Sequence, residues 1–340
     1  MDEISLADLT SRWGNTEVVA RHPELHHYTS VMGLEGMLST QTLWATHFKY
    51  LNDTSEVFGI EGQMSAELAL SFETILRRRR MILSVHKAIA ANGGLKRFAR
   101  TLADSFYSLL SKVTFYDSDE PASETVSGTP YIFSFCSHEG EDYEKRNGLL
   151  SQWRGYARDN GVCIVFDTKQ ILSKLDEEFA SRSYTHVSFD DVIYAKDGFS
   201  LTDQFPDFFD DCDTYVRIKF GQKIKDPGAE TIAGFITAAT RYKHRAFMEE
   251  REVRIVACPT PPSFFDDSPR SGISKLPQKE TFTCGERDRI ALFENQSSPL
   301  PIKRIIVGPS KNKSETAETV KAIVHGRWPV DISETPYIEP

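Results

Sequence analysis

The chain has 340 residues, 40% of them hydrophobic and 26% charged, which is typical of a globular protein with a large buried core. Nothing in it approaches the roughly 18 consecutive apolar residues of a membrane-spanning helix, and its acidic start lacks the apolar core of a signal peptide, so we expect a cytoplasmic protein with no membrane partner. The net charge of −9 excludes a protein that coats nucleic acid indiscriminately, and five scattered cysteines without a Cys-x-x-Cys pair disfavour both a zinc ribbon and a disulfide framework.

The first part of the chain is predicted to alternate extended and helical segments. Alternating apolar residues indicate strands, and apolar residues spaced by three and four indicate helices. In chain order the elements are a strand at 25–30, a helix at 31–40, an extended piece at 43–45 and a helix start marked by Asn52, Asp53 and Glu56.

A long helical segment interrupts this pattern. Apolar residues recur at three and four positions from 57 to 91, Gly93 and Gly94 break the spacing, and a second helix is predicted over 95–113. We therefore expect residues 57–115 to form a helical insertion or subdomain.

The rest of the chain is predicted to be rich in strands with helices between them. The expected strands lie at 131–136, 161–166, 186–194, 252–258, 302–307 and 330–332, and the expected helices at 168–180, 224–247 and 314–325. Because no repeat and no clear linker occurs, the sequence predicts one elaborated α+β domain over residues 1–340.

The first strand carries an unusual group of polar residues. Alternation places His27 and Thr29 on one face and His26 and Tyr28 on the other. A histidine followed by hydroxyl groups suits hydrogen bonding to a sugar diol, because an imidazole offers both a donor and an acceptor. The alternative is a structural histidine bonded to a neighbouring loop.

A second group lies on the predicted helical turn 151–156. Gln152 and Tyr156 are four residues apart and share a face, so their amide and ring could hydrogen-bond and stack on a planar ring such as nicotinamide or a base. Trp153 is predicted to pack in the core instead.

A third group lies on the strand at 252–258, where Glu252 and Arg254 share a side. A carboxylate beside an arginine stays ionised, which suits the stabilisation of positive charge in a transition state. The alternative is an ordinary surface ion pair. Glu249 and Glu250 are neighbouring candidates, but Glu252 is favoured because it is set into an apolar strand.

Six short motifs follow one another along the chain. They are His27-Tyr28-Thr29-Ser30, Leu43-Trp44-Ala45-Thr46, Leu51-Asn52-Asp53 with Glu56, Ser151-Gln152-Trp153 with Tyr156, Glu250 through Arg254, and Ile306-Val307-Gly308-Pro309. This ordered set resembles the bacterial domain of unknown function 2971 family, over roughly residues 25–310.

A weaker resemblance links the same residues to ADP-ribosyltransferases, whose plan has a histidine or arginine on the first strand, an aromatic or serine in the middle and a glutamate on a late strand. It implies an ADP-ribosyltransferase-like mixed sheet core with a long helical insertion. His27 would hold the NAD ribose, Tyr156 would lie against nicotinamide, and Glu252 would orient a ribose hydroxyl and stabilise the oxocarbenium-like state. The other residues expected at the NAD site are Tyr28, Thr29, Ser30, Gln152 and Arg254.

The resemblance implies an NAD-dependent ADP-ribosyltransferase or NAD glycohydrolase of bacterial toxin or phage-defence type. NAD would be the substrate, and the acceptor would be a protein, a nucleic acid or water. No metal ligand is predicted, since neither a His-Glu-x-x-His motif nor a His/Cys cluster at ligand spacing occurs.

Two alternatives stay open. One is a nucleotide- or nucleic-acid-binding module without NAD chemistry, and the other is a metal-dependent nuclease. The first would use Arg241, Lys243 and Arg245, and the second Asp53, Glu56 and Glu252.

Overall fold

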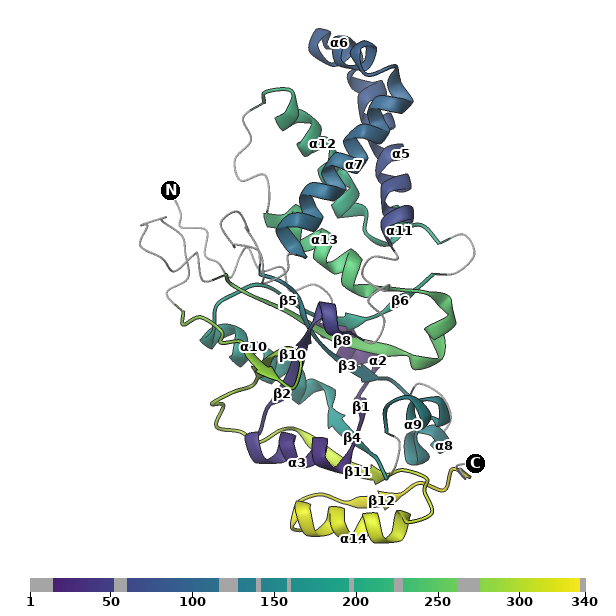
Figure 1. Ribbon diagram of the computed structural model, residues 1–340, viewed down its shortest axis with the longest axis vertical. Coiled ribbons are helices and arrows are strands. Elements are labelled where there is room, and N and C mark those ends of the chain that lie inside the picture. Colours follow the sequence, from purple (N-terminus) through teal and green to yellow (C-terminus); the bar gives the residue numbers. More distant parts are fainter. Residues whose placement is uncertain are drawn as a thin grey trace.

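A mixed β-sheet forms the middle of the molecule, and a group of helices projects from one end of it (Figure 1). The computed structural model describes residues 15–51, 60–115, 128–138, 142–157, 160–195, 199–222, 229–261 and 276–336. None of the helices in these ranges is both long and apolar enough to cross a membrane.

The main sheet joins strands from the whole length of the chain. Its strands are β1 (Glu24–Thr29), β2 (Leu43–His47), β3 (Tyr131–Cys136), β4 (Val162–Asp167), β5 (Tyr184–Asp191), β8 (Glu252–Pro259), β9 (Phe282–Cys284), β10 (Arg287–Leu292), β11 (Ile302–Val307) and β12 (Val330–Ile332). The order is β12-β11-β4-β1-β3-β2-β10-β9, and β8 pairs with both β3 and β5. Strands β11 and β12 run parallel, whereas the other pairs are antiparallel, so the sheet is mixed.

The sheet divides along one edge of β3, because two strands share that edge. Strand β1 meets β3 only at the pair His26 and Cys136, while β2 meets it at Thr46–Ile132 and His47–Tyr131. Between these two junctions, β3 has no strand partner on this edge within the described ranges, although β8 pairs with its other edge throughout. Part of this edge of β3, around Ser134, is therefore free of strand pairing in the described part of the chain, and the side chain of His27 lies against it.

Each face of the sheet packs on different helices. Helices α2 (Asn15–Arg21), α3 (Val31–Thr40), α10 (Thr168–Ser181) and α14 (Lys313–Val324) cover one face through buried apolar residues such as Leu34, Ile171 and Val320. The second face is covered by α9 (Leu150–Tyr156), which follows α8 (Asp142–Asn147), and by α13 (Ala229–Arg241). The polar residues of β8 lie on this second face, between α9 and α13.

The projecting helices have a hydrophobic core of their own. They are α5 (Glu61–Arg79), α6 (Leu83–Ala91), α7 (Leu95–Thr114), α11 (Leu201–Gln204) and α12 (Pro206–Lys219), packed on α13. Phe72, Phe106, Phe208 and Phe235 are buried at its centre. Two 3₁₀ helices, η1 (Phe48–Tyr50) and η2 (Arg245–Glu250), and the short parallel strands β6 (Ile193–Tyr194) and β7 (Tyr242–Lys243) complete the described fold.

The α+β class with a mixed sheet is confirmed, and most predicted elements occur within one or two residues of their expected bounds. Three expectations were wrong in detail. The helix expected over 57–91 is two helices, α5 and α6, separated by a turn after Arg79. This break could not be predicted, because the turn contains no glycine or proline. The strand expected over 186–194 is interrupted at Val192, and the helix expected over 224–247 ends at Arg241.

The early end of α13 has a physical cause. Tyr242 and Lys243 leave the helix to pair with Ile193 and Tyr194, and the Lys243 side chain thereby reaches the carboxylate of Glu252. Helix α12 and the β9–β10 hairpin were not predicted. The candidate cap residues Asn52, Asp53 and Glu56 lie outside the described residues.

Trp153 fastens α9 to the sheet, as predicted for a core residue. Its side chain is 2% exposed, its indole nitrogen donates to the Asn147 carbonyl at 2.9 Å, and its ring meets that of Tyr28 edge-on at 4.7 Å between centroids. Gly308 lies so close that an added Cβ would stand 2.8 Å from the indole, which shows how tightly this site is packed.

Trp153→Ala should therefore lower the free energy of unfolding by about 3–5 kcal/mol, because it leaves a cavity in the core and removes the indole hydrogen bond to Asn147. Urea denaturation measures the loss. Tyr143→Ala, on an aromatic residue that is 42% exposed, is the matched control and should cost less than about 1 kcal/mol. Equal losses in the two variants would show that Trp153 is not a core anchor.

Candidate functional site

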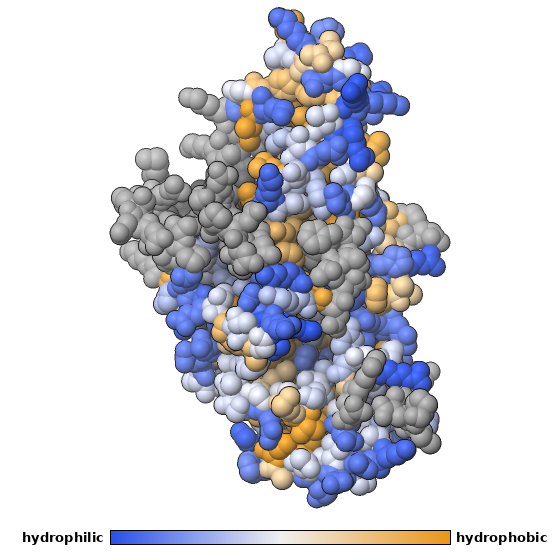
Figure 2. All heavy atoms as spheres, viewed as in Figure 1, coloured by the Kyte–Doolittle hydropathy of each residue, from blue (hydrophilic) through white to orange (hydrophobic). Residues whose placement is uncertain are grey.

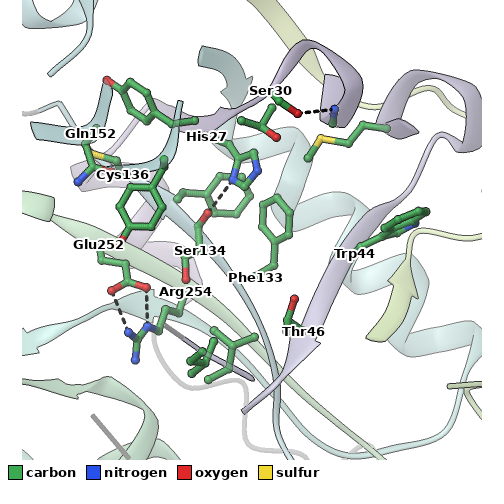
Figure 3. Close-up of a pocket in the computed structure, with 18 of the residues that line it drawn as sticks. His27, Ser30, Trp44, Thr46, Phe133, Ser134, Cys136, Gln152, Glu252 and Arg254 are labelled. Atoms are coloured by element: carbon green, nitrogen blue, oxygen red, sulfur yellow. Dashed lines mark hydrogen bonds and ion pairs between the residues drawn. The ribbon is translucent and has the colours of Figure 1, made fainter. Parts of the chain in front are cut away.

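A cavity of about 720 Å³ lies beside this part of β3. All eight predicted site residues line it, namely His27, Tyr28, Thr29, Ser30, Gln152, Tyr156, Glu252 and Arg254. Figure 3 shows Glu252 and Arg254 at one side, Trp44 and Thr46 of β2 at the other, and His27 and Phe133 between them. Residues from three distant parts of the sequence are thus brought together.

Glu252 is the most strongly held group in the cavity. Arg254 donates to both of its carboxylate oxygens, from Nε at 2.7 Å and from a terminal nitrogen at 2.9 Å, and Lys243 donates from Nζ at 2.9 Å. The hydroxyl of Ser134, on the neighbouring strand, adds a further hydrogen bond. Glu252, Arg254 and Ser134 point from the second face of the main sheet, and Lys243 reaches them from β7.

Burial alone would raise the pKa of Glu252, since it disfavours the charged form. The positive charges of Arg254 and Lys243 and the hydrogen bonds outweigh burial and lower the pKa to about 2. The carboxylate is therefore ionised at any physiological pH, which is the state that the proposed transition-state role requires.

Glu250 is a second carboxylate in the same cavity. It accepts a hydrogen bond from Lys243 at 2.6 Å and one from the Tyr156 hydroxyl at 3.0 Å, and its side chain is 18% exposed. Burial raises the pKa of Tyr156 to about 12, and the Glu250 charge adds to this effect, so the phenol stays protonated as the donor. Glu249, in contrast, is exposed and does not line the cavity.

The backbone turns sharply at Arg251, between Glu250 and Glu252, and both of these carboxylates line the cavity. The φ of 44° at Arg251 lies in the left-handed region of backbone conformation, which residues other than glycine rarely adopt. The conformation is held by its ion pair with Glu144 at 2.6 Å and by the start of β8 directly after it. This sharp change of direction allows Glu250, at the end of η2, and Glu252, on β8, to share Lys243.

His27 faces the cavity from the opposite side. It belongs to the other face of the sheet and reaches the cavity because β1 leaves β3 after His26. Its Nδ1 lies 3.0 Å from the Ser134 carbonyl oxygen, and its ring stacks on Phe133 at 4.5 Å. Burial lowers the pKa of His27 to about 4, so at neutral pH the imidazole is uncharged. With Nδ1 donating to the carbonyl, Nε2 is left as an acceptor.

Among the remaining predicted residues, Tyr28 and Ser30 form hydrogen bonds to neighbouring segments that line the cavity or lie next to it. The Tyr28 hydroxyl accepts a hydrogen bond from the Leu149 amide at 2.8 Å and lies 3.0 Å from His138 Nε2. Ser30 caps α3 by accepting from the Gly33 amide at 3.1 Å. Gln152 is buried and lines the cavity, on the face of α9 that also carries Tyr156.

Four further cavity residues were not predicted as functional: Ser134, Lys243 in its role beside Glu252, Arg287 and Arg289. Ser134 is the one polar residue in the apolar strand Tyr131–Cys136, and this could have marked it. Arg287 and Arg289 gave no comparable signal, because the β9–β10 hairpin was itself missed.

The residues of the two alternatives are not assembled in the same way. Lys243 is buried against Glu250 and Glu252, whereas Arg241 pairs with Asp190 at 2.9 Å. The two cations are therefore held by different carboxylates and do not form one cationic site. Asp53 and Glu56 lie outside the described residues. No group of three or more His, Cys, Asp and Glu side chains that could hold a metal ion occurs within the described ranges.

Residues 152–255 match a family described as "Protein of unknown function (DUF2971)", which confirms the resemblance to that family over this segment. The matched segment includes Tyr156, Glu252 and Arg254 but not the first strand. No curated protein and no solved structure matches.

Arg254→Met should lower the free energy of unfolding by about 3–5 kcal/mol, because Glu252 would stay buried with Lys243 as its one remaining cation. The double variant Arg254→Met/Glu252→Gln should lose less free energy of unfolding than the single variant, since the negative charge of Glu252 is then removed as well. Urea denaturation measures both. Arg77→Met is the control: this side chain is 64% exposed in its pair with Glu73, and its loss should cost less than about 1 kcal/mol. If the double variant lost as much as Arg254→Met, charge burial would not be the cause.

Proposed function

We propose that this member of the DUF2971 family is an enzyme that cleaves NAD at the nicotinamide glycosidic bond, as an ADP-ribosyltransferase or an NAD glycohydrolase. We further propose that its divided sheet is an ADP-ribosyltransferase-like core. The observation that carries the proposal is a buried, ionised Glu252 on a late strand that shares one cavity with His27 of the first strand.

The cavity has the size of a small-molecule site. Its volume of about 720 Å³ falls within the roughly 300–1,000 Å³ range of ligand pockets. Aromatic rings such as Trp44 and Tyr156 and fixed polar groups such as Glu252 line it together, which suits a planar ring attached to a sugar.

Glu252 would act on the ribose. Loss of nicotinamide leaves positive charge on the sugar, and an ionised carboxylate close to that sugar stabilises it. Arg254, Lys243 and Ser134 already occupy the carboxylate oxygens, so a ribose hydroxyl would replace the Ser134 hydroxyl, which can rotate away. Arg254 and Lys243 then hold the carboxylate in a fixed orientation during the reaction.

His27 and α9 would position the two ends of the reacting bond. The neutral His27 offers Nε2 as an acceptor for a ribose hydroxyl. Gln152 and Tyr156 offer an amide and a ring to nicotinamide from the other side of the cavity. Glu250 is the more exposed of the two carboxylates, which suits removal of a proton from the incoming acceptor. That acceptor is a protein, a nucleic acid or water, and a toxin or phage-defence role in bacteria would fit such a reaction.

The geometry gives the alternatives less support. A phosphate-binding module based on Arg241, Lys243 and Arg245 would need free cations, but Lys243 and Arg241 are engaged by carboxylates. A nuclease that used Glu252 as a metal ligand would require the metal to displace Arg254 and Lys243 from it.

Purified wild-type protein incubated with NAD should release nicotinamide, which chromatography detects. Glu252→Gln keeps the shape of the side chain and removes its charge, so release should fall by at least about a hundredfold. Glu249→Gln is the matched control and should react like the wild type. No release by the wild type, even with cell lysate supplied as acceptor, would overturn the proposal, as would full activity in Glu252→Gln.

His27→Ala should mainly weaken NAD binding, with an increase in KM of about tenfold from the loss of one hydrogen bond. Steady-state measurement of nicotinamide release separates KM from kcat. Because the pKa of His27 is about 4, wild-type activity should show no step between pH 5.5 and 8 that His27→Ala removes. An unchanged KM would place the ribose elsewhere in the cavity.

A further inference from the structure

Two arginines of β10 face the same cavity as Glu252. Arg287 and Arg289 are two residues apart on one strand, so they share a face, and both line the cavity. Arg289 lies opposite Thr46 on β2 and opposite Phe282 on β9. This face of the β2–β10–β9 region therefore carries both arginines together with Trp44 and Phe282.

These arginines differ from the other cations of the cavity in having no carboxylate partner among the residues that the structure describes. Asp288, which lies between them, is on the opposite face and is engaged by Thr283 at 3.0 Å and Tyr50 at 3.3 Å. The Nε of Arg289 is shielded from solvent and has no hydrogen-bond partner within the described ranges. A buried N–H donor without a partner is costly, so its presence here points to an anion that completes the site.

Aromatic side chains hold this region in shape. The Arg289 guanidinium lies over the Trp44 ring at 5.3 Å, and the Trp44 and Phe282 rings meet edge-on at 5.4 Å. Stacking on the indole limits the directions in which the guanidinium can turn its N–H groups. Figure 2 shows hydrophilic side chains gathered around β9 and β10 on this side of the molecule, next to a hollow. Both rings are half-buried and leave apolar surface beside the two charges.

We propose that Arg287, Arg289 and Trp44 form the subsite for the nucleoside diphosphate part of the substrate. Guanidinium groups bind phosphate through paired, charge-assisted hydrogen bonds, and a nearby aromatic surface suits a base. The proposal rests on the proposed function and gives the substrate a direction: its phosphates lie at β10, and the bond to be broken lies at Glu252.

The experiment is calorimetric titration of the full chain with ADP, which carries both phosphates and the adenosine but no nicotinamide. Wild-type protein should bind ADP, and Arg289→Gln and Arg287→Gln should each weaken it by about tenfold or more. The control Arg100→Gln removes an exposed charge on α7, outside the cavity, and should leave affinity unchanged. Arg287 is exposed, so its replacement tests the subsite even where Arg289→Gln fails to fold.

The outcomes separate this subsite from the proposed function. ADP binding that depends on the two arginines supports the subsite, whether or not nicotinamide is released from NAD. Release of nicotinamide by a protein that does not bind ADP, or that loses ADP affinity equally in Arg100→Gln, overturns the subsite and leaves the proposed reaction standing. Inorganic pyrophosphate that binds as tightly as ADP overturns the nucleoside part of the assignment.

Discussion

The buried cluster of Glu252, Arg254 and Lys243 joins the parts of this protein. Arg254 donates to the Thr240 carbonyl at the end of α13, Lys243 comes from β7, and the Glu252 amide donates to the Tyr194 hydroxyl on β6. The cluster as a whole thus links α13, the small β6–β7 pair and the main sheet. These three charged side chains are buried and stabilise one another, because burying any one of them without its partners would cost free energy. The chemistry proposed for Glu252 would depend on the same cluster, since its cations keep the carboxylate ionised and oriented.

The division of the sheet is the second constraint on the site. An undivided sheet would present one face to α9 and α13 and the other to α3, α10 and α14, with no passage between them. Since β1 touches β3 at one pair of residues and β2 touches it at another, the interval around Ser134 becomes the floor of a cavity. His27 from one face and Glu252 from the other thereby line the same cavity. This shared cavity follows from the absence of strand pairing, within the residues that the structure describes, along a few residues of one edge of β3.

Much of this could be predicted from sequence, because it depends on local patterns. The strands around His27, Ser134 and Glu252 are rich in apolar residues, and polar residues set into such strands marked His27 and Glu252 as candidate site residues. What could not be predicted depends on pairing between distant segments. The divergence of β1 and β2 leaves no trace in either strand, and the position of Lys243 depends on a helix that ends to pair with Ile193 and Tyr194. The β9–β10 hairpin has short, largely polar strands, so the arginines at the far end of the cavity remained unnoticed.

The placement of the helices between β2 and β3 has a consequence for how the chain folds. Strand β1 finds its long partner β4 only after more than a hundred intervening residues, and β2 ends at His47 while β3 begins at Tyr131. Contacts between segments so far apart form slowly in a flexible chain, because closing a long loop costs conformational entropy. Helices α5 and α7 pack side by side through contacts that are much nearer in sequence. Once this helical hairpin has formed, the two ends of the intervening segment are already close, and the effective loop between β2 and β3 is short. We therefore expect early formation of the helical hairpin to lower the entropy cost of bringing β2 and β3 together.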